Sequence, residues 1–263
     1  MIEIILTFFI GIFIGSFLNV LIYRLPRNES IAYPPSHCPH CKHKIRIYDL
    51  FPIISYILLN GKCRNCKAHI SLQYPVIEFI TGVLFVLSFF HAQSISQAYD
   101  ILFLVHLIFA LVVSCSLLVI FMIDLRSGII PFKVLVPAFA VTLLYLILTN
   151  SQELPLYLLS GLGAGGFFLL IFLFTKGRGM GFGDVVYAFF MGVLLGFPGI
   201  VAGLYIAFLT GAVISLVLIG KGLKKFHGDS IPFGPFLVFG TYIIFFWGDS
   251  ILKIVNNILI HLP

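Results

Sequence analysis

Two aspartates lie where long apolar stretches end or begin, and together they could carry out acid–base chemistry. Asp124 lies at the end of one stretch, in FMIDLRSGIIPF, and Asp184 opens another, in GMGFGDVVYAFF. An isolated carboxylate is costly beside hydrocarbon, so ionisable residues at such positions are candidates for function. Two carboxyl groups that share one proton can work as a pair, one as base toward water and the other as proton donor to a scissile carbonyl. The pair is therefore a candidate for aspartyl proteolysis.

Each aspartate also has a purely structural explanation. Asp184 could act as the N-cap of the helix that follows, because an aspartate at that position accepts backbone N–H bonds and suits the positive end of the helix dipole. Asp124 could pair with nearby Arg126. The glycines before Asp184, including Gly181 and Gly183, favour the catalytic reading, because glycine allows close backbone approach and unusual dihedral angles.

Four cysteines form two short pairs with the spacing of a metal site. Cys38, Cys41, Cys63 and Cys66 make the pattern C-x2-C-x21-C-x2-C, in the segments CPHC and CRNC. Four thiolates with this spacing can surround zinc tetrahedrally, and such a site would stabilise a polar segment too small to build its own core. Unliganded or redox-active thiols are the alternative. A disulfide framework is disfavoured if the segment faces the cytoplasm.

The composition indicates that these residues are positioned by membrane helices. The chain has 263 residues, of which 10% are charged, and a mean hydropathy of +1.11. Apolar runs close to the ~20 residues needed to cross a bilayer occur at about 3–23, 75–93, 100–123, 132–149, 155–175, 199–220 and 233–256, with a shorter run at 185–197. We expect an all-α, polytopic membrane helix bundle of about eight spans. Seven spans are the alternative, with the short run as part of a re-entrant pair.

The positive charges predict the orientation of this bundle. With eight spans, fifteen of the sixteen Lys and Arg residues fall on one side, which the positive-inside rule identifies as cytoplasmic. The first run lacks a basic start and an obvious small-residue cleavage site, so it is read as a retained helix and not as a signal peptide. Asp124 and Asp184 then face the cytoplasm together. Topology and anionic lipid headgroups account for the net charge of +6, and no nucleic-acid partner is expected.

Several blocks in a fixed order resemble one bacterial family. They are GSFLNVLIYRLP at 15–26, the two cysteine pairs, YPVIEFITG at 74–82, Asp124 followed by IIP, GMGFGD at 179–184 and IPFGPFL at 231–237. The chain resembles the bacterial type IV prepilin peptidases (leader peptidase/N-methyltransferase), of the GxGD class of intramembrane aspartyl proteases.

This resemblance implies a specific activity and location. It implies that Asp124 and Asp184 are the catalytic pair. They would belong to a peptidase region at 74–263, which is separated from a first span at 1–24 by the cysteine-bearing segment. The substrates would be prepilins or pseudopilins, cut on the cytoplasmic side of the inner membrane after a glycine. The new N-terminal residue would then be methylated from S-adenosylmethionine, an activity associated with the zinc-bearing region at 25–73.

Further residues in the family blocks have less definite roles. Glu78 could orient the N-terminus of the substrate or contribute to methylation, or it could simply pair with Arg24 or another buried base. Asn19 and Arg24 could likewise serve substrate binding or methyl transfer. Helix packing explains Asn19 at least as well, and positive-inside anchoring explains Arg24 at least as well. Pro232, Gly234 and Pro235 interrupt the chain before the last run and are expected to shape the loop that faces the active site.

Two other functions compete with this reading. One is a GxGD protease that cuts other membrane proteins without methyltransferase activity, although no Pro-Ala-Leu motif is visible. The other is a zinc-binding membrane scaffold or transporter whose acids bind ions. A transporter of that kind would have acids at the membrane midplane and an internal repeat, but no repeat is visible and both aspartates lie near an interface. In the bundle itself, the small residues of SGLGAGG at 160–166 are expected to let helices approach closely.

Overall fold

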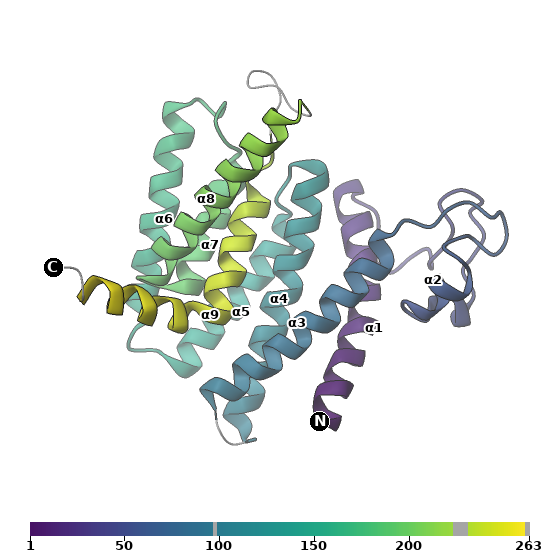
Figure 1. Cartoon of the computed structure of the whole chain (residues 1–263), viewed down its shortest axis with the longest axis horizontal. Helices are drawn as coiled ribbons and strands as arrows, with labels where there is room; N and C mark the ends of the chain where they lie inside the picture. Colours follow the sequence, from purple (N-terminus) through teal and green to yellow (C-terminus); the bar gives the residue numbers. More distant parts are fainter. Residues whose placement is uncertain (97–98, 223–230, 261–263) are drawn as a thin grey trace. The chain divides into compact units, whose positions relative to one another are not determined.

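The computed structural model describes residues 1–96, 99–222 and 231–260, and each regular element in these ranges is a helix (Figure 1). The expectation of an all-α fold is therefore confirmed for this part of the chain. Lys224 and Lys225, two of the expected cytoplasmic charges, lie outside the described residues. The helices, with η for short 3-10 turns, are α1 (Ile2–Arg24), η1 (Leu25–Arg27), η2 (Ile47–Leu50), α2 (Ile54–Leu58), α3 (Gln73–Ile95), α4 (Ile101–Ser127), α5 (Phe132–Thr149), α6 (Leu154–Phe174), α7 (Phe182–Leu195), α8 (Gly199–Gly220) and α9 (Gly234–Ile260).

Seven of the described helices are long and apolar enough to cross a membrane. They are α1, α3, α4, α5, α6, α8 and the part of α9 up to Ile254. Helix α7 is apolar but has only 14 residues, so its length is about 21 Å, well short of the ~30 Å hydrocarbon core. The protein is thus a multi-pass membrane helix bundle with seven helices of spanning length and one shorter apolar helix, in agreement with the predicted fold class.

The chain forms two compact units, Met1–Cys115 and Ser116–Pro263. In the first unit, α1 and α3 pack along each other with their backbones close together. A Cβ atom on Gly11 would lie 2.8 Å from the Cα atom of Gly82, and one on Gly15 would lie 2.7 Å from the Cα atom of Glu78. Small residues at such crossings allow the close packing on which membrane helices depend. The cysteine-bearing segment lies between these two helices in the sequence.

In the second unit, α7 is the central helix and contacts α5, α6, α8 and α9. Its closest neighbour is α6, where a Cβ atom on Gly161 would lie 2.5 Å from a methyl group of Val193 and one on Gly165 would lie 3.0 Å from the Cβ atom of Phe189. Gly163 and Gly166 of the same segment face open space. The predicted close approach is therefore confirmed for the two glycines that face α7.

Glycines lie at both ends of α7, and the one at the C-terminal end has a conformation that favours glycine. Gly181 is the N-cap residue, and Gly196 ends the helix with a φ of 63°, a left-handed conformation that glycine adopts without strain. Pro198 follows two residues later and precedes α8. These boundaries put Asp184 in the first turn of the most enclosed helix of the unit.

Candidate active site and metal centre

The second unit brings the two predicted aspartates together. Asp124 lies in the last turn of α4 and Asp184 in the first turn of α7, and their residues are only 3% and 8% exposed. The two carboxyl groups interact electrostatically. A second contact joins the same segments, since a Cβ atom on Gly183 would lie 3.1 Å from the Cβ atom of Ile130. The convergence predicted from topology is thus present in the fold.

The start of α9 packs directly against the carboxyl group of Asp124. A Cβ atom on Gly234 would lie 2.3 Å from Oδ2 of Asp124, so any larger residue at position 234 would overlap this oxygen. The same oxygen is buried and has no partner at full hydrogen-bond geometry among the described residues, although the Gly234 backbone N–H lies close enough to interact with this carboxyl group. Arg126 is exposed and does not satisfy it. A buried carboxyl oxygen without a full hydrogen bond calls for an explanation, such as a catalytic role or an ordered water.

Asp184 is held by its own helix. Its Oδ2 accepts a hydrogen bond from the Gly181 N–H at 3.0 Å. Gly181 is the N-cap and Asp184 is the third helical residue, so the predicted capping occurs, but from inside the helix and not from the N-cap position. This bond fixes the carboxyl group in its position near Asp124. Capping and pairing are therefore compatible roles.

The two glycines of the motif owe their positions to different causes. Gly181 has φ −77° and ψ 152°, an extended conformation open to any residue, and an added Cβ atom would meet nothing closer than 3.6 Å. The expectation of unusual dihedral angles is therefore wrong at Gly181. At Gly183 the close approach to Ile130 supports the expected need for a residue without Cβ.

A buried hydrogen bond that the sequence did not single out links the helices carrying the site. The hydroxyl of Thr241 on α9 donates to the Leu237 carbonyl at 2.7 Å, so the Tyr187 hydroxyl on α7 donates to Thr241 Oγ1, at 2.9 Å. Tyr187 follows Asp184 by one turn, and Thr241 follows Gly234 by two turns. The sequence could have indicated this contact only through the neutral polar residues inside the apolar runs. Many such residues form hydrogen bonds only to the backbone of their own helix, so their presence does not predict a contact between helices.

The four cysteines form one cluster in the first unit. Their Sγ atoms all lie within 4.8 Å of one another, and those of Cys38 and Cys66 are 3.8 Å apart. Zinc bound tetrahedrally at ~2.3 Å from each sulfur would place the sulfurs about 3.8 Å apart. The donor set and its geometry therefore fit zinc, and the cluster could bind this ion.

The two cysteine pairs adopt the same local structure. In each, the N–H of the first cysteine donates to the carbonyl five residues later, at 3.0 Å for Cys38 and 2.8 Å for Cys63. The backbone N–H groups of Lys42 and Lys67, each four residues after that cysteine, donate to its backbone carbonyl at 2.9 and 3.0 Å. Both lysines have positive φ angles, of 59° and 60°. A backbone hydrogen bond from His43 lowers the pKa of Cys41 to about 7, which favours the thiolate form that binds metals, while burial and the neighbouring thiols raise the pKa of Cys66 to about 11.

An ion pair ties η2 to the second cysteine pair. Arg64 donates to both carboxylate oxygens of Asp49, through Nη2 at 2.7 Å and Nε at 2.9 Å. These hydrogen bonds hold the pKa of Asp49 below its ordinary value. Because Arg64 lies between Cys63 and Cys66, the pair connects the cysteine cluster to the segment that leads into α2.

The remaining candidate residues hold the first unit together. Asn19 donates to the carbonyls of Gly15 and Tyr74 at 3.3 and 3.2 Å and accepts from Gln73 at 3.2 Å, so it joins α1 to the start of α3. This is the helix-packing role considered for it.

Arg24 and Glu78 contact different backbone groups. Arg24 donates to the carbonyls of Ser30 and Pro34 at 2.7 and 2.6 Å, which shapes the loop after α1. The Oε2 atom of Glu78 accepts the Ile53 N–H at 2.8 Å. Glu78 thereby connects α3 to the start of α2.

The fold and these two sites define a class of protein: a helical, multi-pass membrane protein with paired buried carboxyl groups and a separate four-cysteine cluster. Residues 9–92 match the Bacterial Peptidase A24 N-terminal domain, and residues 111–216 match the Type IV leader peptidase family. The chain belongs to this family of peptidases.

Curated relatives match almost the whole chain. Proteins named prepilin leader peptidase/N-methyltransferase from Aeromonas hydrophila and Legionella pneumophila are each 31% identical, and the alignments cover 94% and 93% of this chain and 92% of each relative. A protein of the same name from Pseudomonas aeruginosa is 28% identical over 94% of this chain and 91% of its own length. No solved structure matches this chain.

Proposed function

We propose that the protein removes the leader peptides of type IV prepilins or pseudopilins and then methylates the new N-terminus. The observation that carries the proposal is the meeting of two buried carboxyl groups, Asp124 and Asp184, in a chain whose relatives are named for both activities. Cleavage occurs after a glycine, and S-adenosylmethionine is the co-substrate that donates the methyl group.

The geometry supports a mechanism in which the two carboxyl groups share one proton. One carboxylate takes a proton from water as the water oxygen attacks the scissile carbonyl carbon, while the other carboxyl group donates its proton to the carbonyl oxygen. As the tetrahedral intermediate collapses, one hydroxyl proton returns to the second carboxylate and the C=O bond re-forms, while the C–N bond breaks and the proton taken from water goes to the leaving amine. The hydrogen bond from Gly181 to Asp184 and the packing of Gly234 on Asp124 hold the two groups in place.

The distribution of charge supports a site that faces the cytoplasm. Residues 24–67 contain eight Lys and Arg residues, which the positive-inside rule places in the cytoplasm. A prepilin has a short basic leader before an apolar helix, so its cleavage point lies where cytoplasm and membrane meet. Asp124 at a helix end and Asp184 at a helix start match this level in the bacterial inner membrane.

The cysteine segment has a separate role in this proposal. Residues 25–73 hold a structural zinc ion through Cys38, Cys41, Cys63 and Cys66 and support methyl transfer, while residues 74–263 form the peptidase region. Zinc supplies folding free energy to a short polar segment. Asn19 and Arg24 act through the packing and loop contacts described above. Glu78 acts by holding the start of α2 near α3.

The competing functions have less support. A transporter or zinc-binding scaffold would have no need for Gly234 to lie against one carboxyl oxygen, and the named relatives are enzymes. A protease without methyltransferase activity conflicts with the names of the relatives and with the intact cysteine cluster.

Mass measurement of one substrate tests the proposal. Purified protein is incubated with a prepilin, with and without S-adenosylmethionine. Loss of the leader mass in both reactions, and a further gain of one methyl group only with S-adenosylmethionine, is expected. An unchanged prepilin mass would refute the peptidase activity, and cleavage without a methyl gain would refute the transferase activity alone.

A further inference from the structure

The segment Ile47–Leu58, between the two cysteine pairs, exposes an apolar surface although it belongs to the polar part of the chain. In α2, Ile54, Ile57 and Leu58 lie on one helical face and are all exposed, Ile57 by 64% and Leu58 by 75%. Ile47 and Phe51, just before α2, are exposed as well. Clustered exposed apolar side chains of this kind mark binding surfaces for proteins or membranes.

Phe51 connects this apolar surface to a membrane helix. Its ring lies 5.7 Å from that of Phe13, edge to face. Phe13 is eleven residues before the end of α1 at Arg24, which corresponds to about 16 Å along the helix. Since α1 has the length of a membrane span, Phe13 lies near its middle. Phe51 must therefore reach below the membrane surface.

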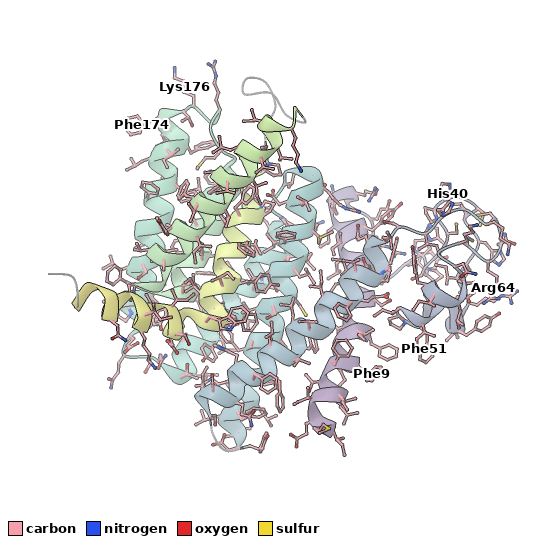
Figure 2. All side chains as sticks on the ribbon, in the orientation of Figure 1. Phe9, His40, Phe51, Arg64, Phe174 and Lys176 are labelled. Carbon is pink, nitrogen blue, oxygen red and sulfur yellow. The ribbon has the colours of Figure 1, made fainter. Side chains whose placement is uncertain are left out.

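The same face of α1 is itself exposed to the surroundings. Phe9, Phe13 and Phe17 are each about half exposed in the described structure, as expected for side chains that contact lipid in a spanning helix. Figure 2 shows Phe51 on the side of the cysteine segment nearest α1, with His40 and Arg64 farther from that helix. The apolar surface of Ile47–Leu58 is thus continuous with a lipid-facing surface.

A backbone turn inside this segment is satisfied in a way that suits membrane depth. Ile53 has φ 60° and ψ −52°, and the Ile54 N–H donates to the Pro52 carbonyl at 2.5 Å, which is a tight three-residue turn rarely adopted by branched residues. The Ile53 N–H donates to the Glu78 carboxylate at 2.8 Å. In hydrocarbon an unsatisfied N–H costs several kcal/mol, and the Glu78 side chain, itself buried in protein, removes that cost by accepting the Ile53 N–H.

The charges around the segment match an anionic lipid surface. Residues 25–73 contain seven Lys and Arg residues but only two acids, Glu29 and Asp49, so six basic residues remain when the Arg64–Asp49 ion pair is set aside. Basic side chains beside an exposed apolar face are typical of segments that lie in the membrane interface, and anionic lipids attract them.

We infer that Ile47–Leu58 is a membrane-embedded wedge, in which Phe51 and the apolar face of α2 insert into the anionic leaflet beside α1 and basic side chains contact the headgroups. The cysteine cluster is then held at the membrane surface and does not move freely in the cytoplasm. This inference does not depend on the proposed catalytic activities.

Site-specific tryptophan fluorescence in a bilayer tests the wedge. Trp247 is the one native tryptophan, so Trp247→Phe gives a silent background for three single variants, Phe51→Trp, Leu58→Trp and the control His40→Trp. Each full-length, zinc-loaded variant is placed in bilayers of phosphatidylglycerol and phosphatidylcholine, with quenching by brominated acyl chains compared with quenching by aqueous acrylamide.

The wedge predicts opposite behaviour for the two classes of position. Phe51→Trp and Leu58→Trp should be quenched by brominated lipid more strongly than His40→Trp and should be protected from acrylamide. Strong acrylamide quenching at positions 51 and 58 would overturn the inference, because the segment would then lie in water. Weak quenching by both agents would also overturn it, because protein would then cover the surface. Leu58→Trp keeps the test valid if Phe51→Trp does not fold.

Discussion

Substitution of Gly234 by alanine tests how tightly α9 packs on the Asp124 carboxyl group. The added Cβ atom would lie 2.3 Å from Oδ2, far inside van der Waals contact, so the carboxyl group or the start of α9 must shift by about 1 Å. A misplacement of that size can cost about 100-fold in rate. We expect a loss of prepilin cleavage of this order.

The expected effect on stability is smaller than the effect on activity. Gly234 does not have a positive φ, so alanine fits its backbone conformation, and the overlap involves the end of a side chain that can rotate. Gly240→Ala in the same helix offers a matched comparison, because its Cβ atom would lie 2.3 Å from the backbone carbonyl oxygen of Gly203, which cannot rotate away. We therefore expect Gly240→Ala to lower the melting temperature more than Gly234→Ala. The loss in free energy of unfolding should lie within the roughly 1–3 kcal/mol typical of overpacking.

The assay combines prepilin cleavage per folded molecule with the melting temperature of each variant in detergent. Gly163→Ala is the neutral control, since a Cβ atom at this α6 position meets nothing within 4 Å and alanine favours a helix. It should retain cleavage and keep or raise the melting temperature. Cleavage by Gly234→Ala equal to that of Gly163→Ala would refute the argument that position 234 must leave room for the Asp124 carboxyl group.

Three further predictions concern the rest of the molecule. Cys38→Ser or Cys66→Ser should release zinc, as measured by metal analysis. Either variant should impair methylation or folding more than leader cleavage. Stoichiometric zinc in a protein lacking both cysteine pairs would contradict the ligand assignment. Tyr187→Phe should lower the free energy of unfolding by only about 0.5–1.5 kcal/mol, because the Thr241 hydroxyl keeps its bond to Leu237. A loss well above this range in a denaturant titration would contradict the assignment of a single ordinary hydrogen bond between Tyr187 and Thr241. Asp49→Asn should speed the transfer of zinc to a chelator, because it removes the ion pair with Arg64. Arg64 holds the pKa of Asp49 below its ordinary value of about 3.9. The stabilisation of the folded cysteine segment by this carboxylate is therefore fully present above that pH and is lost only as the pH falls through the lowered pKa. The difference from the native protein should thus be constant between about pH 6 and 8, and a difference that vanishes within this range would contradict the ion pair.

The pattern of apolar runs predicted the fold because each run is long enough to determine its own structure. The boundaries of the predicted runs agree with the helices, and the short run at 185–197 corresponds to α7 at Phe182–Leu195. The convergence of Asp124 and Asp184 followed from the topology. The cysteine spacing likewise identified a cluster whose geometry fits zinc.

Contacts between distant segments could not be predicted in the same way. Nothing in the apolar runs indicates that Tyr187 bonds Thr241, or that Gly234 and not a neighbouring residue lies against Asp124, because these contacts depend on how helices are rotated and offset. The contact between Glu78 and Ile53 was also missed, since it requires an unusual turn at Ile53. The exposed apolar face of α2 was hidden in a segment that is polar on average.

Cleavage of a prepilin by Asp184→Asn protein, correctly inserted and loaded with zinc, tests the central claim most directly. Asparagine keeps the size of the side chain and caps a helix about as well as aspartate, but it cannot titrate. The two-acid mechanism predicts that cleavage collapses in Asp184→Asn and in Asp124→Asn, that the double variant loses little more than either single one, and that methylation of a precleaved pilin survives in all three. Near-normal cleavage by Asp184→Asn would contradict the mechanism and leave Asp184 with the role of a helix cap.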